Sequence, residues 1–132
     1  MRTSYFAKSA KDPLAISIAK SAPKWYSGRH YPALAPGWAI IKIKNPSEYE
    51  YRYRREILDR LNPQRVFDEL GENAILLCWE KPGEFCHRRI VAAWLSEKLG
   101  IEIPELNYAP VQEPDPEYAE EELDEQLCLF NL

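Results

Sequence analysis

The chain has 132 residues, which suits one compact domain, and 45% of them are apolar, which excludes a wholly disordered chain. Its 17 Lys and Arg and 21 Asp and Glu give a formal net charge of -4. No apolar run approaches the roughly 18 residues of a membrane span, and the N-terminus lacks the apolar stretch of a signal peptide. We therefore expect a cytoplasmic protein without paired disulfides, since cysteines stay reduced there.

The charge is distributed unevenly along the chain. No Lys or Arg follows Lys98, and residues 113–132 contain eight acids, which leaves residues 1–112 with a net charge of +4. A mildly basic body suits an anionic ligand. We predict one domain over residues 1–103, an acidic flexible tether over 104–125 and a docking peptide over 126–132.

The elements of the first half are short. Residues 3–7 predict a strand, and residues 14–19 predict a second because apolar and small side chains alternate. Residues 20–36 are rich in Pro, Gly and aromatic side chains and predict a long functional loop. Residues 38–43 predict a third strand at a sheet edge.

Strands and helices alternate in the second half. The patterns predict a helix over 45–61 capped by Asn45, a helix over 62–70, a buried strand over 74–79, a helix over 86–99 and a short strand over 101–103. This alternation predicts an α/β fold: a layered, largely parallel, Rossmann-like sheet flanked by helices, followed by the extended acidic tail.

The most informative segment runs from the carboxyl end of the buried strand into the last long helix. Ligands of open α/β sheets bind at that edge, and a helix N-terminus attracts anions. We expect Arg88 and Arg89 to bind a phosphate or carboxylate there, because Arg can hold either with two hydrogen bonds.

Cys86 is placed where its thiol should ionise easily, because a helix N-terminus and nearby cations favour a thiolate. We therefore expect Cys86 to be the nucleophile, with His87 or Glu80 as proton carrier. Neighbouring residues on a helix point in different directions, so His30 from the long loop remains an equally open candidate for the base. Both Cys78 and Cys86 also fit as simply packed thiols.

Several of these residues have side chains that can also bind a metal ion. Cys78, Cys86, His87 and His30 are metal ligands by type, but their spacing matches no common zinc pattern, so no metal site and no cofactor are expected.

Residues 76–89, Leu-Leu-Cys-Trp-Glu-Lys-Pro-Gly-Glu-Phe-Cys-His-Arg-Arg, resemble the signature of the domain-of-unknown-function 488 family. The resemblance covers residues 2–103, and the N-terminal stretches resemble a short bacterial and phage branch. This sequence departs from the family pattern at residues 18–20, where Ile-Ala-Lys replaces the Asp-Val-Arg of many members, so that Lys20 stands in place of the Arg. The resemblance implies that the motif positions are Cys78, Glu80, Cys86, His87 and Arg88.

The long loop combines positive charge with flat side chains. Nucleic-acid bases stack on aromatic rings while lysines hold phosphate, so the loop predicts a nucleotide or single-strand binding surface. The alternative is a loop whose aromatic rings cap the core. The candidate ligand-binding residues of the loop are Lys20, Lys24, Trp25, Tyr26 and His30.

The chain ends in an apolar cluster behind the acidic tether. Residues 126–130, Gln-Leu-Cys-Leu-Phe, resemble the pentapeptide that binds the bacterial sliding clamp. The resemblance implies that Gln126, Leu127, Leu129 and Phe130 contact that partner. The alternative is a terminal helix that folds back on the body.

Together these observations predict a cysteine-dependent enzyme that acts on a nucleotide or nucleic acid and is recruited to the sliding clamp. Two other functions remain open: a non-catalytic nucleotide or nucleic-acid binding module, and a thiol redox or metal-binding protein that uses Cys78 and Cys86. The sequence does not indicate an oligomeric state.

Overall fold

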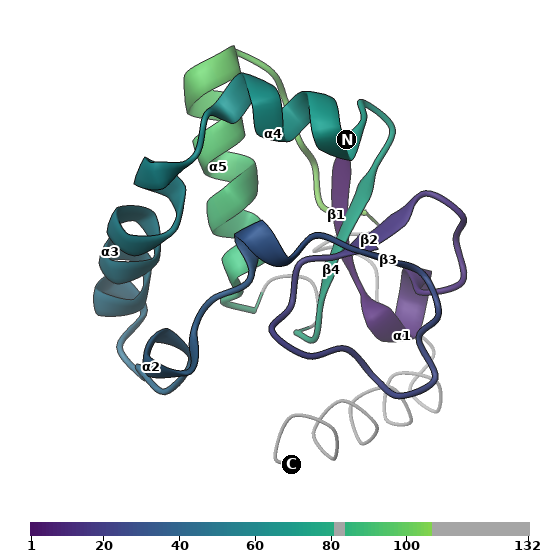
Figure 1. The fold of residues 1–132 in the computed structure, drawn as a ribbon, viewed down its shortest axis with the longest axis horizontal. Helices are drawn as coiled ribbons and strands as arrows, with labels where there is room; N and C mark the ends of the chain where they lie inside the picture. Colours follow the sequence, from purple (N-terminus) through teal and green to yellow (C-terminus); the bar gives the residue numbers. More distant parts are fainter. Residues whose placement is uncertain (81–83, 107–132) are drawn as a thin grey trace, which may run out of the picture.

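The computed structural model describes residues 1–80 and 84–106. Four parallel strands form one sheet in the order β1-β4-β2-β3 (Figure 1). The strands are β1 (Arg2–Tyr5), β2 (Ala15–Ser17), β3 (Arg29–His30) and β4 (Ile75–Cys78). The predicted α/β fold with a parallel sheet is thus confirmed. The predicted docking residues Gln126, Leu127, Leu129 and Phe130, and most of the predicted tether, lie outside the described residues.

Two layers of side chains cover the sheet. The helices are α1 (Phe6–Ser9), α2 (Trp38–Ile41), α3 (Pro46–Glu56), α4 (Pro63–Leu70) and α5 (His87–Leu99), with 3-10 turns at Pro32–Leu34 and Leu58–Arg60. Helix α5 packs on β1 and β4 and also contacts α3 and α4 (Figure 1). Along β4, Leu76 points into this main core, whereas Ile75 and Leu77 pack with Phe6 and Tyr26 on the other face. No helix in the described part of the chain has the length and apolar character of a membrane span.

The predicted starts of α3 and α4 are confirmed. Asn45 Oδ1 accepts a hydrogen bond from the Glu48 amide, and Asn62 Oδ1 accepts one from the Arg65 amide, both at 3.0 Å. A proline follows each Asn at the first helical position, where its missing N–H costs no hydrogen bond.

Several predicted elements differ from the structure, among them the strand over 3–7, which ends at Tyr5 because α1 begins at Phe6. Residues 38–43 were predicted as an edge strand, but the amides of Ile40 and Ile41 both bond to the Gly37 carbonyl and form the single-turn helix α2. This turn buries Ile40 in the core. The predicted helix over 45–61 ends at Glu56 and continues only as the 3-10 turn. The predicted last strand over 101–103 is an extended segment instead, and it pairs with β1 further on, through one bridge between Thr3 and Glu105.

The strand order creates a crevice between β2 and β4. The chain leaves β2 toward β3 at one edge, whereas it leaves β4 through α5 toward the bridge between Thr3 and Glu105, beside β1 at the other edge. The connections therefore diverge at the carboxyl ends of β2 and β4. Such a topological switch point is where open α/β sheets bind their ligands.

Candidate functional site

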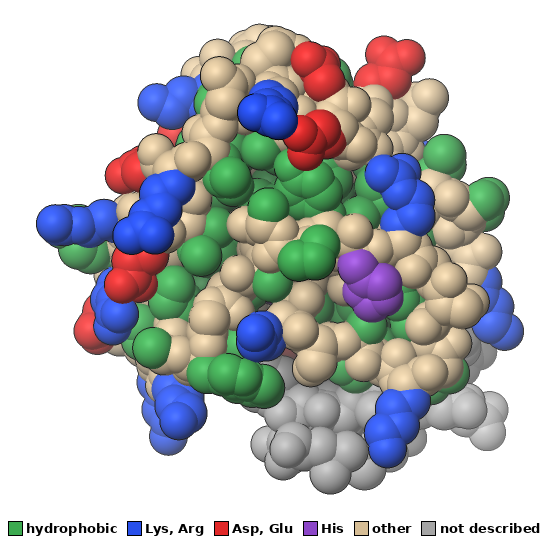
Figure 2. All heavy atoms as spheres, viewed as in Figure 1, with side chains coloured by type: hydrophobic (Ala, Val, Ile, Leu, Met, Phe, Trp, Pro, Cys, Tyr) green, Lys and Arg blue, Asp and Glu red, His purple; other side chains and the backbone are tan. Residues whose placement is uncertain are grey.

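A cleft of about 1240 Å³ lies at this switch point. The residues after β2, the α2 region and the residues after β4 form its walls. On the face shown in Figure 2, basic and hydrophobic side chains lie next to one another at the lower left, where α2 lies in Figure 1. The residues that line the cleft and bear on its chemistry are Lys20, Lys24, Trp25, Trp38, Lys42, Lys44, Tyr49, Cys78, Trp79, Glu80, Glu84, Phe85 and His87.

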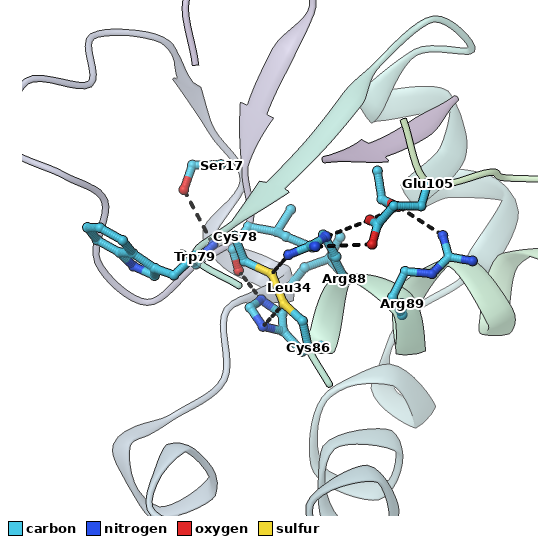
Figure 3. Close-up of a disulfide and its surroundings, with 12 residues drawn as sticks. Ser17, Leu34, Cys78, Trp79, Cys86, Arg88, Arg89 and Glu105 are labelled. Carbon is cyan, nitrogen blue, oxygen red and sulfur yellow. Dashed lines mark hydrogen bonds and ion pairs between the residues drawn. A yellow bond between two sulfur atoms is a disulfide. The ribbon is translucent and has the colours of Figure 1, made fainter. Parts of the chain in front are cut away.

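Two of the three cysteines meet beneath this cleft. Cys78 ends β4, and Cys86 is the N-cap residue of α5. Their sulfur atoms form a disulfide, and both side chains are buried (Figure 3). The expectation of unpaired thiols is therefore wrong for this pair. Cys78 lines the cleft and Cys86 does not. The cysteine that faces the cleft is therefore Cys78, whereas the sequence favoured Cys86 as the nucleophile.

Arg88 does not point into the cleft. Its side chain is fully buried, and its Nε and Nη2 atoms donate to the Glu105 carboxylate at 2.7 and 3.1 Å. Its Nη1 donates to Cys78 Sγ at 3.2 Å, so that the guanidinium lies between the sulfur and the carboxylate (Figure 3). Burial alone would raise the pKa of Glu105, but the hydrogen bonds and charge of Arg88 lower it. The expectation that Arg88 binds a ligand anion is thus wrong, because its donors already have partners inside the protein.

Arg89 also differs from its expected place. Its Nη1 donates to Thr3 Oγ1 at 2.8 Å and to the Ile103 carbonyl at 3.1 Å, on the β1 side of the sheet. Arg89 therefore anchors the segment after α5 and is not among the residues that line the cleft.

His87 lies beside the disulfide in a fixed orientation. Its Nε2 is 2.7 Å from the Ile18 carbonyl oxygen, and its Nδ1 is 4.0 Å from Cys86 Sγ. A carbonyl only accepts hydrogen bonds, so Nε2 carries the hydrogen and Nδ1 presents its lone pair to the sulfur. Burial and the nearby positive charge of Arg88 together lower the pKa of His87 to about 4, although the hydrogen bond to the Ile18 carbonyl opposes this shift. His87 is therefore neutral at physiological pH.

Glu80 follows Cys78 by two residues and lines the cleft. Burial raises the pKa of its carboxyl, and the negative charge of Glu84 adds to that effect, while a backbone hydrogen bond and Arg88 oppose it. A carboxyl in a cleft whose pKa is raised keeps its proton to higher pH than a free carboxyl does, which is the property that general acids use. Its predicted role as proton carrier fits this position.

The long loop contributes only part of its predicted residues. Lys20, Lys24 and Trp25 line the cleft as expected. Tyr26 is buried and its hydroxyl donates to the Arg29 carbonyl at 2.7 Å, so it belongs to the core. His30 is exposed on β3 and does not line the cleft. The predictions for Tyr26 and His30 are wrong, because the chain turns back into the sheet as β3.

Sequence reasoning missed the wall formed by α2 and the residues around it. Trp38, Lys42 and Lys44 line the cleft, and Phe85 lies on it next to Tyr49, with ring centroids 5.0 Å apart. The mixture of basic and aromatic residues over 38–44 is the same signal that marked the loop over 20–31, but these residues were assigned to a strand. No local signal marks Glu105, whose partner is 17 residues away.

The pKa of His87 predicts a loss of stability in mild acid. The unfolded chain takes up a proton near pH 6.5, whereas folded His87 stays neutral until about pH 4. Stability linked to His87 is therefore present above pH 6.5 and falls by about 3 kcal/mol as the pH drops toward 4. His87→Gln keeps a donor for the Ile18 carbonyl and should remove this component in denaturant unfolding at pH 7, 5.5 and 4.5. His30→Gln is the exposed control, and equal pH dependence in His87→Gln and the wild type would contradict the prediction.

Comparisons with known proteins address the family. A family model named DUF488-N3a, described as the active DUF488-N3 subclade, matches residues 7–99. No curated protein matches the chain, and no solved structure matches it. The matched residues include Cys78, Cys86, Glu80, His87 and Arg88, and they make up more than half of the chain. The protein therefore belongs to the DUF488 family.

Proposed function

We propose that this protein is a cysteine-dependent enzyme that acts on a nucleotide or a nucleic acid bound in the cleft. The observation that carries the proposal is the contact of 3.2 Å between Arg88 Nη1 and Cys78 Sγ at the cleft. A fixed guanidinium next to a sulfur stabilises the thiolate, which is the nucleophilic form of cysteine. The reduced protein is the active form, because the disulfide leaves no free thiolate.

Cys78 is the nucleophile and Cys86 its disulfide partner. The Cys78 thiolate bonds to an electrophilic atom of the substrate while the bond from that atom to the leaving group breaks. Glu80 acts as the general acid: the raised pKa of its carboxyl favours the protonated form, which gives its proton to the leaving group. The Glu80 carboxylate then takes a proton from the water that displaces the sulfur and restores the enzyme.

The cleft suits an anionic ligand with flat groups. Among its described lining residues are four lysines, whereas the two acids are Glu80 and Glu84. Trp25, Trp38 and Phe85 are between 42% and 59% exposed, which leaves their rings free to stack on bases. Stacking on an aromatic ring contributes about 1–3 kcal/mol per base, and lysines attract phosphate.

A binding module without catalysis is the second candidate. It is favoured by the disulfide itself, since a Cys78 bonded to Cys86 cannot attack a substrate while the lysines and rings of the cleft remain available. In that case Cys78→Ser would bind the ligand with the affinity of the wild type, and neither protein would show turnover.

The proposal extends to the C-terminus, on the resemblance of residues 126–130 to the clamp-binding pentapeptide. A short apolar peptide behind an acidic segment can reach a pocket on a partner, and the partner is the bacterial sliding clamp.

The first prediction concerns the reactive sulfur. In Cys86→Ser, which cannot form the disulfide, Cys78 should react with iodoacetamide with a half-maximal rate at lower pH than free cysteine, because Arg88 stabilises its thiolate. Mass spectrometry measures the rate at each pH. Arg88→Gln in the same background should move the profile to higher pH. A profile at or above that of free cysteine before this substitution removes Cys78 as nucleophile.

The second prediction concerns the lysines of the α2 side. Lys42→Gln combined with Lys44→Gln should weaken binding of a fluorescein-labelled single-stranded oligonucleotide by at least about tenfold at low salt, since two phosphate contacts are lost. Fluorescence anisotropy measures the affinity. The matched control is Lys11→Gln combined with Lys98→Gln, which removes the same charge from exposed positions off the cleft. Equal weakening by both pairs would mean that the oligonucleotide binds elsewhere.

The third prediction concerns the tail. Deletion of residues 126–130 should abolish co-elution with purified sliding clamp in gel filtration, because the apolar side chains that fill the partner pocket are removed. Deletion of residues 117–121 is the control, since it removes the same number of residues from the acidic tether and keeps the pentapeptide. Unchanged co-elution after the first deletion refutes recruitment by this peptide.

A further inference from the structure

Cys78, Cys86 and His87 form a cluster of three side chains that can each bind a metal ion. One ligand atom from each side chain, the two Sγ atoms and a ring nitrogen of His87, all lie within 4.8 Å of one another, and all three side chains are buried. We propose that in the reduced protein these three side chains bind one thiophilic divalent cation of the Zn²⁺ class, with the fourth position open to the cleft. This site goes beyond the proposed function, which needs no metal.

His87 is oriented as a metal ligand. Its Nε2–H donates to the Ile18 carbonyl at 2.7 Å, which fixes the tautomer and leaves the Nδ1 lone pair directed at the sulfurs. A metal-binding histidine usually donates its other ring N–H to a carbonyl or carboxylate in this way.

The charges of the cluster balance around a divalent cation. Two thiolates neutralise the cation, and the adjacent Arg88 is already neutralised by Glu105 at 2.7 Å. The buried site therefore gains no net charge when the metal binds, which avoids the cost of burying an unpaired ion. Arg88 Nη1 keeps its place as hydrogen-bond donor to Cys78 Sγ, as a second sphere of contacts around a metal thiolate does.

The backbone is spaced for such a site. The Cα atoms of Cys78 and Cys86 are 7.3 Å apart, whereas most disulfides span roughly 4.4–6.8 Å. Two sulfurs about 2.3 Å from one zinc ion are farther from each other than bonded sulfurs are, so the wider spacing suits both thiolates. Three protein ligands and one open position are typical of catalytic rather than structural zinc sites. Cys78 and His87 also line the cleft, from which a water would complete the shell.

Metal binding and the disulfide exclude each other. A phosphine reductant and one water convert the disulfide into two thiols and the phosphine oxide, and the cation then displaces the two thiol protons. The spacing in the sequence matches no common zinc pattern, because Cys86 and His87 are adjacent and Cys78 is eight residues away. The fold removes this objection by returning the helix start to the strand end.

Co²⁺ and Zn²⁺ test the site directly. Wild-type protein reduced with a phosphine should bind one Co²⁺ per chain with an intense thiolate-to-cobalt absorption band, and Zn²⁺ should remove that band. Cys78→Ser, Cys86→Ser and His87→Gln should each weaken Co²⁺ binding at least about tenfold. His30→Gln and Cys128→Ser are the matched controls and should bind as the wild type does. Circular dichroism confirms that each variant is folded.

A second measurement needs no variant. Zn²⁺ should protect Cys78 and Cys86 of the reduced wild type from iodoacetamide while Cys128 is still modified, as mapped by mass spectrometry. Reduced protein that binds no Co²⁺, or binding that survives His87→Gln but is lost in Cys128→Ser, overturns the proposal. Such a failure leaves Cys78 as nucleophile untouched, because its reactivity with iodoacetamide is measured without metal.

Discussion

The buried ion pair between Arg88 and Glu105 is the interaction on which the site depends. Both side chains are almost completely buried, at 0% and 5% exposure, and the pair joins the first turn of α5 to the segment that returns beside β1. Removing one partner of such a pair costs about 3–5 kcal/mol, since the other charge stays buried without compensation. The pair also leaves one guanidinium nitrogen over for Cys78 Sγ. Glu105 thus both holds the C-terminal end of the domain and places the positive charge at the sulfur.

The same constraint explains why the two arginines of the motif are not ligand-binding residues. A guanidinium at 0% exposure cannot reach a ligand in the cleft without leaving Glu105, and Arg89 is tied to Thr3 and to the backbone after α5. The arginines have their partners inside the protein, and the lysines carry the positive charge that lines the cleft. The positive charge next to the Cys78 sulfur and the positive charge of the cleft are therefore supplied by different residues from different elements.

The sequence predicted what depends on neighbouring residues. Local pattern accounts for the caps at Asn45 and Asn62, the unbroken apolar run of β4 and the parallel sheet. These features correctly placed Cys78 and Glu80 at the carboxyl end of β4. What failed depends on contacts between distant segments. Arg88 and Glu105 are 17 residues apart, and His87 finds its carbonyl 69 residues away at Ile18. The short helix α2 was missed because one turn has no room for a periodic pattern, so its cleft-facing side chains were missed with it.

The chemistry of the cleft follows from which partner the Cys78 sulfur has. Arg88 favours negative charge on that sulfur in every state in which it is reduced, while the His87 lone pair faces the second sulfur. In the proposed function Cys78 is the nucleophile when both thiols are free, and Cys86 is its disulfide partner. A disulfide between the two sulfurs, or the proposed cation bound to both, would use the same sulfur electrons and would block that nucleophile. The burial of both cysteines, at 1% and 3% exposure, restricts access to the side that faces the cleft.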